Sequence, residues 1–324
     1  MKTLQMDTLS PDQTDYLRRI SASIDSLYSL MTSYDGDNGG TFDQEFHRRL
    51  KTIHDASCDC LPTVREALMK YCFEKTAPEL DTSNIHRRGR QKPLGYAGDF
   101  LSIDWTYQKL SDSPGRGRLW DEFYHRQDAP LAVCARKDLF GDIIEDIVAT
   151  DTSRSCRVLN VASGPGREIR DALVRHSSLK DMITVDCLDN SADALAYSKT
   201  LIGPVLSQSV NFHCGNAILF RPQTPYDFVW CAGLFDYLQD RLAVSLLKRL
   251  WNAVDRGGRL VIGNFAETHR TRPYIEWCGN WFLIHRSKQE MQALADQAGI
   301  PANLVAHHVD EWGAIRYLTA VRPD

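Results

Sequence analysis

The fold is best predicted from Val158-Leu159-Asn160-Val161-Ala162-Ser163-Gly164-Pro165-Gly166-Arg167-Glu168. The apolar run from Arg157 to Ala162 indicates a buried parallel strand, and Glu168 to Val174 indicates a helix. Strand, glycine turn and helix in this order form the nucleotide-binding corner of a doubly wound sheet. Glycine suits the turn because a Cβ would keep a ligand from the backbone, and the amides at the helix N-terminus can face an anionic or polar group.

The next two apolar runs each end in a group that a nucleoside needs. Met182 to Leu188 is followed by Asp189, whose carboxylate can accept both ribose hydroxyls. Val210 to Cys214 is followed by Gly215-Asn216-Ala217, where a side-chain amide could meet adenine. A lone Gly-x-Gly turn is often only a tight turn, but three consecutive strand ends of this kind favour a nucleoside site.

Strands and helices alternate through the rest of the C-terminal part. This pattern predicts an α/β fold, a doubly wound and mostly parallel seven-stranded sheet with helices on both faces. Right-handed crossovers would bring the ends of the first four strands to one edge. The further expected strands are Tyr226–Ala232, Arg259–Asn264 and a closing antiparallel pair, Ala302–His308 and Ala314–Val321; the further expected helices are Ala192–Leu201, Arg241–Val254 and Ser287–Ala298.

The N-terminal part shows helical spacing instead. Ser10-Pro11-Asp12-Gln13 and the pair Thr41 and Gln44 predict capped helix starts, and a third helix is expected over Pro62–Phe73. Apolar stripes such as Leu17, Ile20 and Ile24 predict the core of a helical subdomain; the alternative is the face of a homodimer. Two domains are therefore expected, residues 1–150 as a helical subdomain and lid, and residues 151–324 as the catalytic domain, with the boundary at Asp151–Ser155.

The composition limits which classes of protein the chain can belong to. The 324 residues carry a net charge of −4, which gives no global field for nucleic acid. The first residues lack the form of a signal peptide, and no apolar run is long enough for a membrane span. The nine scattered cysteines indicate reduced thiols in a cytoplasmic protein. His54, Cys58, Cys60 and Cys72 lack the spacing of a common zinc site, so helix packing is expected there and no metal.

The order of the strand ends resembles that of class I S-adenosylmethionine-dependent methyltransferases, whose glycine-rich motif would be Asn160–Gly166. Two residues depart from the family pattern, since Asn160 replaces its usual acid and Ala162 its first glycine. A neutral Asn160 can still orient the loop by hydrogen bonds but would hold the cofactor ammonium more weakly. The resemblance implies S-adenosyl-L-methionine as cofactor, with contacts expected from Asn160, Ala162, Ser163, Gly164, Gly166, Asp189, Asn190, Asn216, Ala217 and Ala232.

Acceptor residues are expected in three other places. Gly95-Tyr96-Ala97-Gly98-Asp99, after the basic stretch His86–Lys92, predicts a loop that packs closely over a ligand. Polar residues, Asp236 and Tyr237, interrupt the apolar run after the fourth strand, and Tyr274–Arg286 is dense in aromatics that suit either an apolar substrate or packing against the N-terminal helices. We expect catalytic roles for Tyr96, Asp99 and Tyr237, and substrate contacts from Arg90, Tyr237, Trp281 and Arg286, the last through a bidentate pair with a carboxylate.

Four stretches together resemble the bacterial methyltransferases that make hydroxy-fatty-acid methyl ester signals. They are Lys92–Phe100, Leu159–Glu168, Gly233–Leu238 and Trp281–Arg286, and the likeness extends over roughly residues 85 to 321. This resemblance implies methylation of a carboxylate on a small molecule. A hydroxyl or amine acceptor is the alternative, with His269 as a candidate base. Two alternatives belong to other functional classes, a nicotinamide-dependent oxidoreductase and a non-catalytic relative. The oxidoreductase fits less well, because its dinucleotide motif needs a third glycine where this chain has Ile169.

Overall fold

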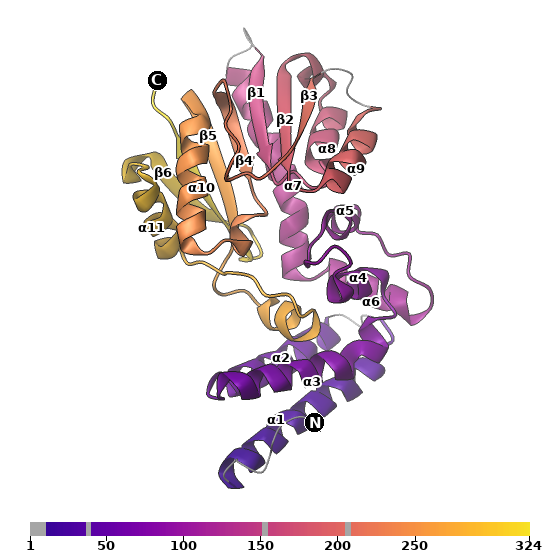
Figure 1. The fold of residues 1–324 in the computed structure, drawn as a ribbon. Helices are drawn as coiled ribbons and strands as arrows, with labels where there is room; N and C mark the ends of the chain where they lie inside the picture. The colour runs from indigo at the N-terminus through magenta and orange to yellow at the C-terminus, as the bar shows by residue number, and fades with distance from the viewer. Residues whose placement is uncertain (1–10, 37–39, 151–154, 205–208) are drawn as a thin grey trace. The chain divides into compact units, whose positions relative to one another are not determined.

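The computed structural model describes residues 11–36, 40–150, 155–204 and 209–324, which form two compact units. The helical unit consists of the described part of Met1–Ser102 together with Lys109–Gln127 and Arg270–Phe282. The sheet unit consists of Ile103–Gln108, the described part of Asp128–His269, and Leu283–Asp324. Figure 1 shows the elements of both units along the chain.

The helical unit is built around a cluster of aromatic rings. Phe46 lies at the centre, with its ring centroid 5.0 Å from that of Phe123 and 5.7 Å from that of Tyr274. Trp120 is fully buried in the same cluster. The helices are α1 (Pro11–Thr32), α2 (Thr41–Cys58), α3 (Pro62–Leu80), α4 (Asn84–Gln91) and α6 (Arg116–His125), with a π-helical turn at Tyr274–Cys278; α5 (Phe100–Gln108) begins in this unit and ends in the sheet unit.

The apolar stripe of α1 is core, as one of the two sequence interpretations held. Leu17, Ile20, Ile24, Leu27 and Met31 are all at most 5% exposed within this chain. A homodimer through the N-terminal helices would therefore need other side chains, and it stays a prediction. The capped start at Ser10 lies outside the described residues.

Three local predictions in this part were wrong. The capping box at Thr41 is not formed, because Gly40, with φ at 78°, precedes the helix and no side chain caps it. The basic stretch expected as a loop is mostly the helix α4, started by Ser83, whose Oγ accepts the His86 amide at 3.3 Å. The third helix continues past Phe73 to Leu80, with Pro78 inside its last turn.

The sheet unit contains the predicted seven-stranded sheet. Its strand order is β3-β2-β1-β4-β5-β7-β6, in which β7 pairs antiparallel with both β5 and β6 and the other neighbours are parallel. The strands are β1 (Cys156–Val161), β2 (Ile183–Asp189), β3 (Val210–Cys214), β4 (Tyr226–Cys231), β5 (Val254–Phe265), β6 (Val305–Val309) and β7 (Ile315–Val321). The fold class predicted from the alternation is confirmed.

Helices cover both faces of this sheet. One core joins Phe140 of α7, Ile169 of α8 and Leu195 of α9 to one sheet face. The other joins Leu246 of α10 and Leu294 of α11 to the opposite face. Parallel strands then bring the carboxyl ends of β1, β2, β3 and β4 to one edge, where α/β sheets bind ligands. The helices are α7 (Asp128–Thr150), α8 (Arg167–Arg175), α9 (Ala192–Ile202), α10 (Asp240–Ala253) and α11 (Lys288–Ala298).

The division into units differs from the predicted boundary between residues 150 and 151. Helix α7 precedes that boundary but belongs to the sheet unit, because Phe140 and Ile144 are buried against the sheet. Arg270–Phe282 follows the boundary but belongs to the helical unit, where Tyr274 joins the aromatic cluster. The boundary segment 151–154 itself lies outside the described residues. Among the described helices, none has the length and apolar character needed to cross a membrane.

Candidate active site

The turn between β1 and α8 has the left-handed backbone that its small residues allow. Ala162, Gly164 and Gly166 have φ values of 53°, 51° and 67°. A Cβ placed on Gly164 would meet nothing within 4 Å, so open space lies beside this residue. A Cβ on Gly166 would lie 2.2 Å from Oγ of Ser198. Glycine is therefore required at the two positions for different reasons. At Gly164 it leaves the backbone accessible, and at Gly166 it allows α8 to pack closely on α9.

Asp189 at the end of β2 is held against this turn. Its Oδ2 accepts the Gly164 amide at 2.8 Å, and its Oδ1 accepts the Ser191 amide at 2.9 Å. The side chain is buried. Each carboxylate oxygen can accept a second hydrogen bond, so the fixed carboxylate keeps the capacity that two ribose hydroxyls require. The structure thus brings Asp189 and Gly164 together, as the sequence analysis expected.

Asn160 lies beneath the turn and contacts Glu168. Its Nδ2 donates to Oε1 of Glu168 at 2.7 Å, and both side chains are buried. Burial raises the pKa of Glu168, an effect that the Asn160 hydrogen bond partly offsets. Asn160 therefore orients the start of α8 from inside. Ser163, also buried, adds a backbone bond from its amide to the Leu188 carbonyl at 3.2 Å.

The end of β3 supplies an exposed turn. Asn216 is exposed, and its Oδ1 accepts the Ile218 amide at 2.8 Å. The Gly215 amide donates to the Asp189 carbonyl at 2.8 Å, which ties this turn to the end of β2. Asn190 is exposed beside it and Ala217 is half-buried. Because Asn216 is exposed and uses only its Oδ1 for the turn, its Nδ2 can donate to a nucleobase.

At the end of β4, a buried arginine that the sequence analysis missed supports the chain. Nη1 of Arg136, on α7, donates to the Ala232 carbonyl at 2.9 Å, and Nη2 donates to the Tyr107 hydroxyl at 3.3 Å. A Cβ on Gly233 would lie 3.3 Å from the same Nη1. Arg136 interrupts the buried face of α7 between Val133 and Phe140, and a cation on an apolar stripe was the signal that could have revealed it.

Asp236 and Tyr237 follow, and only the second is accessible. Asp236 is buried, and its Oδ1 accepts the Phe265 amide at 2.6 Å, so it links the ends of β4 and β5. Burial raises the pKa of Asp236 to about 6. Tyr237 is 40% exposed at the same edge. Of these two, Tyr237 has the position expected of an acceptor contact.

Arg286 has a different role from the predicted substrate contact. Its guanidinium donates to the carbonyl oxygens of Phe235 and Leu238, at 2.9 and 2.6 Å. It also donates to Asn264 Oδ1 at 2.7 Å and to Asp240 Oδ1 at 2.8 Å. The side chain is 2% exposed and its donors are used internally. We therefore interpret Arg286 as the residue that fixes the loop after β4 to the end of β5.

Two histidines lie at the end of β5. The ring centroids of His269 and His285 are 5.3 Å apart, and Phe265 lies against both. His269 was named as a candidate base from the sequence, whereas His285 was missed because it stands in an aromatic run without a recognisable motif. The pair adds groups capable of proton transfer to the edge that also carries Tyr237.

The remaining predicted residues belong to the helical unit. Asp99 is buried and accepts the amides of Leu101 and Ser102, at 3.1 and 2.9 Å, so it caps α5, and it pairs with Arg88 at 2.8 Å. Such a carboxylate positions the loop rather than acting as a base. Tyr96 is 40% exposed in this loop.

Arg90 has a structural role in place of the predicted substrate contact. It is buried, pairs with Asp81 at 2.6 Å, donates to the Phe73 carbonyl at 2.7 Å and also donates to the Cys278 carbonyl. Its guanidinium lies 3.8 Å from the centroid of the Phe73 ring. These contacts tie α4 to α3 and to the π-helical turn.

Trp281 lines a small cavity of about 40 Å³ inside the helical unit. Most of the walls are aromatic or aliphatic, from Ile85, Tyr124, Tyr274 and Ile275, and Arg90 also borders it. His86 on the same wall contacts the Tyr274 hydroxyl, and burial lowers its pKa to about 3, so its ring is neutral at physiological pH. The cavity is therefore largely apolar. Across the described residues no group of three His, Cys, Asp or Glu side chains has the geometry to hold a metal.

Known proteins resemble this chain in sequence and in fold. Residues 41–322 match the family described as "Putative methyltransferase". The chain is 27% identical over 244 residues to the uncharacterized protein YnbC of Escherichia coli (strain K12), and the matched part is 69% of this chain. It is 40% of the length of that relative, so the chain spans less than half of the curated protein that it matches.

Two solved structures have the same fold. A possible exported protein from Bordetella parapertussis superposes with a TM-score of 0.57 and 16% identity, over 98% of this chain and 100% of that one. Magnesium protoporphyrin IX methyltransferase from Synechocystis PCC 6803, solved with bound SAH, superposes with a TM-score of 0.50 and 15% identity, over 68% of this chain and 94% of that one. The family match itself runs from the start of α2 to just beyond β7, and the chain therefore belongs to this methyltransferase family.

Proposed function

We propose that the protein transfers the methyl group of S-adenosylmethionine to a carboxylate of a small, partly apolar molecule and so forms a methyl ester. The sulfonium group of the cofactor supplies a methyl that is already electrophilic. The protein must then mainly place the two reactants. Gly164, Asp189 and Asn216 are suited to the nucleoside, by the open space, the fixed carboxylate and the exposed amide described above.

The cofactor assignment is tested by calorimetry with S-adenosylhomocysteine. We expect saturable binding by the wild type, and a loss of about tenfold or more in Asp189→Asn, since a hydrogen bond to a charged group contributes about 1.5–3 kcal/mol. Asp193→Asn, which changes an exposed acid on the adjoining α9, is the matched control. Equal binding by both variants would remove Asp189 from the cofactor site, and binding of reduced nicotinamide dinucleotide instead would favour an oxidoreductase.

The observation that carries the carboxylate preference is the pair of buried guanidinium groups around the end of β4. Arg136 and Arg286 both donate to carbonyl oxygens within Ala232–Leu238. Arg286 is paired with Asp240. Arg136, by contrast, donates to the neutral oxygens of Ala232 and Tyr107, and its positive charge favours an anionic acceptor at this end of the strand. Asp236 is committed to the Phe265 amide, and an acceptor that arrives already ionised needs no base.

The apolar part of the acceptor is assigned to Tyr237, which is exposed at the end of β4 in the sheet unit. The substrate contact expected from Trp281, in the helical unit, stays a prediction. The lid role expected of Tyr96 and its loop stays a prediction; this loop leads directly into α5. The end of α5 is bound through Asp104, which accepts from Arg167 at 2.9 Å and from the Tyr197 hydroxyl at 2.6 Å.

The test is a matched acceptor series in which only the reacting group changes. An acid, an alcohol and an amine with the same alkyl chain are incubated with the enzyme and labelled S-adenosylmethionine, and products are identified by mass spectrometry. We expect ester from the acid, with a rate that is flat above about pH 6 because the carboxylate is already ionised. Methylation of the alcohol or the amine alone would contradict the proposal.

The histidine pair favours a second candidate, methylation of a hydroxyl or amine. His269 and His285 could remove a proton from such an acceptor. In that case His285→Asn lowers kcat by about 10²-fold or more and removes the rise of rate towards alkaline pH. His307→Asn, on β6 and bonded to Gln292, is the control. An unchanged profile in His285→Asn would leave the carboxylate as the acceptor.

A further inference from the structure

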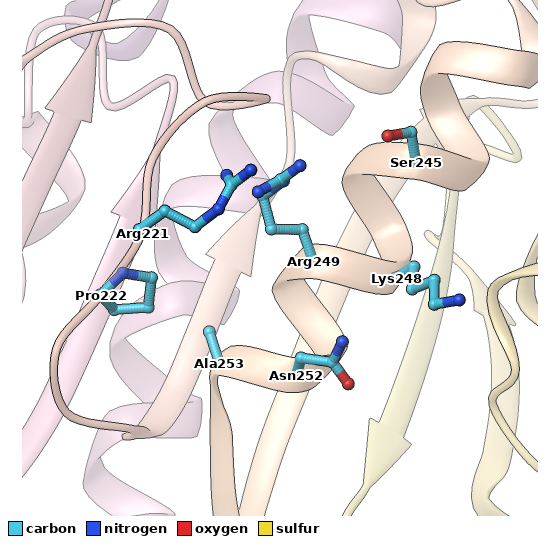
Figure 2. Close-up of a pocket in the computed structure, with 7 residues that line it drawn as sticks. All are labelled: Arg221, Pro222, Ser245, Lys248, Arg249, Asn252 and Ala253. Atoms are coloured by element: carbon cyan, nitrogen blue, oxygen red, sulfur yellow. The ribbon is translucent and has the colours of Figure 1, made fainter.

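A second pocket lies in the sheet unit at the opposite edge of the sheet from the candidate active site. Arg221 and Pro222, in the loop before β4, and the C-terminal half of α10 form this pocket of about 420 Å³ (Figure 2). Because β4 starts at Tyr226 and reaches the cofactor edge only at Cys231, a pocket at its start lies at the amino edge. The methyl-transfer site therefore does not account for it.

The pocket is lined by cations without acidic side chains. Arg221, Lys248 and Arg249 line it together with the neutral donors Ser245 and Asn252. Figure 2 shows the guanidinium groups of Arg221 and Arg249 pointing toward one another, one from the loop and one from α10, while Lys248 extends in another direction. Two like charges that converge in this way repel unless an anion lies between them.

The three cations also have no carboxylate partner among the described residues. Nη1 of Arg221 donates only to backbone, the carbonyls of Ile218, Leu219 and Phe220 at 3.0–3.3 Å. Nε of Arg249 is shielded from solvent and has no hydrogen-bond partner in the described part of the chain. Elsewhere in this unit arginines such as Arg175 pair with carboxylates. The pairing that is usual in the unit is thus missing at this pocket.

The positive charge continues into an adjoining hollow of about 400 Å³. That hollow shares Pro222 and Asn252 with the pocket and adds Arg256 and Arg322, against one acid, Asp255. The whole chain has a net charge of −4, so this concentration of cations runs against the overall balance. A local excess of this kind in a concave surface attracts anions.

We propose that this pocket binds the phosphate group of a small phosphorylated molecule or of a lipid headgroup. Guanidinium groups present paired N–H donors that match two oxygens of a phosphate, and the hydroxyl of Ser245 and the amide of Asn252 can supply further hydrogen bonds. The volume suits a ligand larger than the bare anion. The site is separate from methyl transfer and would be occupied whether or not an acceptor is bound.

The test is calorimetry on the full chain saturated with S-adenosylhomocysteine, so that the cofactor site is closed to the probes. The probes are inorganic phosphate, pyrophosphate, glucose 6-phosphate, and phosphatidylcholine vesicles with and without phosphatidic acid. We expect saturable binding of at least one phosphate-bearing probe. Arg221→Gln and Arg249→Gln should each weaken it by about tenfold or more, because each removes charged hydrogen bonds. Arg18→Gln, an exposed arginine of α1 that does not line the pocket, should bind as the wild type does.

The choice of probes distinguishes the two sources of the phosphate group, a free molecule and a lipid headgroup. Binding of a soluble probe identifies a free phosphorylated molecule, and binding only to phosphatidic acid vesicles identifies a lipid headgroup. Thermal unfolding of each variant, alone and with S-adenosylhomocysteine, shows that the fold and the cofactor site are intact. Lack of saturable binding by every probe would overturn the proposal, as would an equal loss in Arg18→Gln, since binding would then depend on net charge alone.

Discussion

At the scale of single residues, the two glycines of the β1–α8 turn should respond differently to one added methyl group. Gly166→Ala places a Cβ 2.2 Å from Oγ of Ser198 in a left-handed backbone, so we expect a loss of about 2–4 kcal/mol in the free energy of unfolding. Gly164→Ala meets no neighbour and should lose only about 1 kcal/mol from its backbone conformation.

Urea unfolding of both variants measures this difference in stability. Calorimetry with S-adenosylhomocysteine then measures how each variant binds the cofactor. Gly164→Ala should keep its fold and bind the cofactor more weakly, because the Cβ would occupy the open space beside the turn. The double variant Gly166→Ala, Ser198→Gly should recover part of the lost stability. Equal stability of the two single variants would show that packing on α9 is not what requires glycine at residue 166.

At the scale of elements, Arg286 should behave as a structural link between the ends of β4 and β5. Arg286→Lys cannot reach the carbonyls of Phe235 and Leu238 together with Asn264, so we expect a loss of about 3–5 kcal/mol in stability. Asp240→Asn should cost at most about 1 kcal/mol, because the Asp240 side chain is 76% exposed. If instead Arg286→Lys is as stable as the wild type and only raises KM for the acceptor, the result would support the substrate contact that the sequence predicts for Arg286.

Asp236 at the same junction should make stability depend on pH. Burial raises its pKa from an ordinary 3.8 to about 6, so the protonated form is favoured in the folded state. Its contribution to stability is therefore present below about pH 4 and is lost as pH rises through about 6, by roughly 3 kcal/mol. Asp236→Asn keeps an oxygen for the Phe265 amide and has no such titration.

Chemical unfolding of the wild type and Asp236→Asn across this pH range isolates the effect. The difference cancels other groups, including Glu168, whose pKa burial also raises. We expect the wild type to lose stability relative to the variant between about pH 4 and pH 7. A difference that is constant with pH would mean that Asp236 is already ionised throughout the range.

The elements also show which parts of the structure are predictable from the sequence. β3 has the expected bounds, and β2 ends at Asp189, one residue beyond the expected Leu188, because an apolar run that stops at a polar residue marks the carboxyl end of a parallel strand. The partners of Arg286 lie 22 to 51 residues away along the chain, and the contact of His86 with Tyr274 joins residues 188 apart. No local sequence pattern reveals such long-range contacts. A polar residue predicted to contact a ligand can therefore have all its hydrogen-bond donors engaged by other residues of the chain.

At the scale of the whole molecule, the chain passes between the two units more than once. α5 leaves the helical unit at Ser102, and Arg270–Phe282 returns to it from within the C-terminal half. Composition and periodicity describe neighbours in sequence, and so the predicted boundary at residue 150 missed both passages. This connectivity means that the proposed acceptor residues of the helical unit and the cofactor residues of the sheet unit are interleaved in one chain.

Hydrogen exchange can separate the roles proposed for the two units. S-adenosylhomocysteine should slow exchange in the sheet unit, at the amides around Gly164, Asp189 and Asn216, since ligand contacts suppress local opening. An acceptor acid added to that complex should extend protection to the loop around Tyr96 and to Trp281 if the helical unit is the lid. Asp189→Asn should remove both effects, whereas Asp193→Asn should keep them. Protection of the helical unit by the cofactor alone, with no further change on adding an acceptor, would mean that this unit responds to the cofactor rather than to the acceptor.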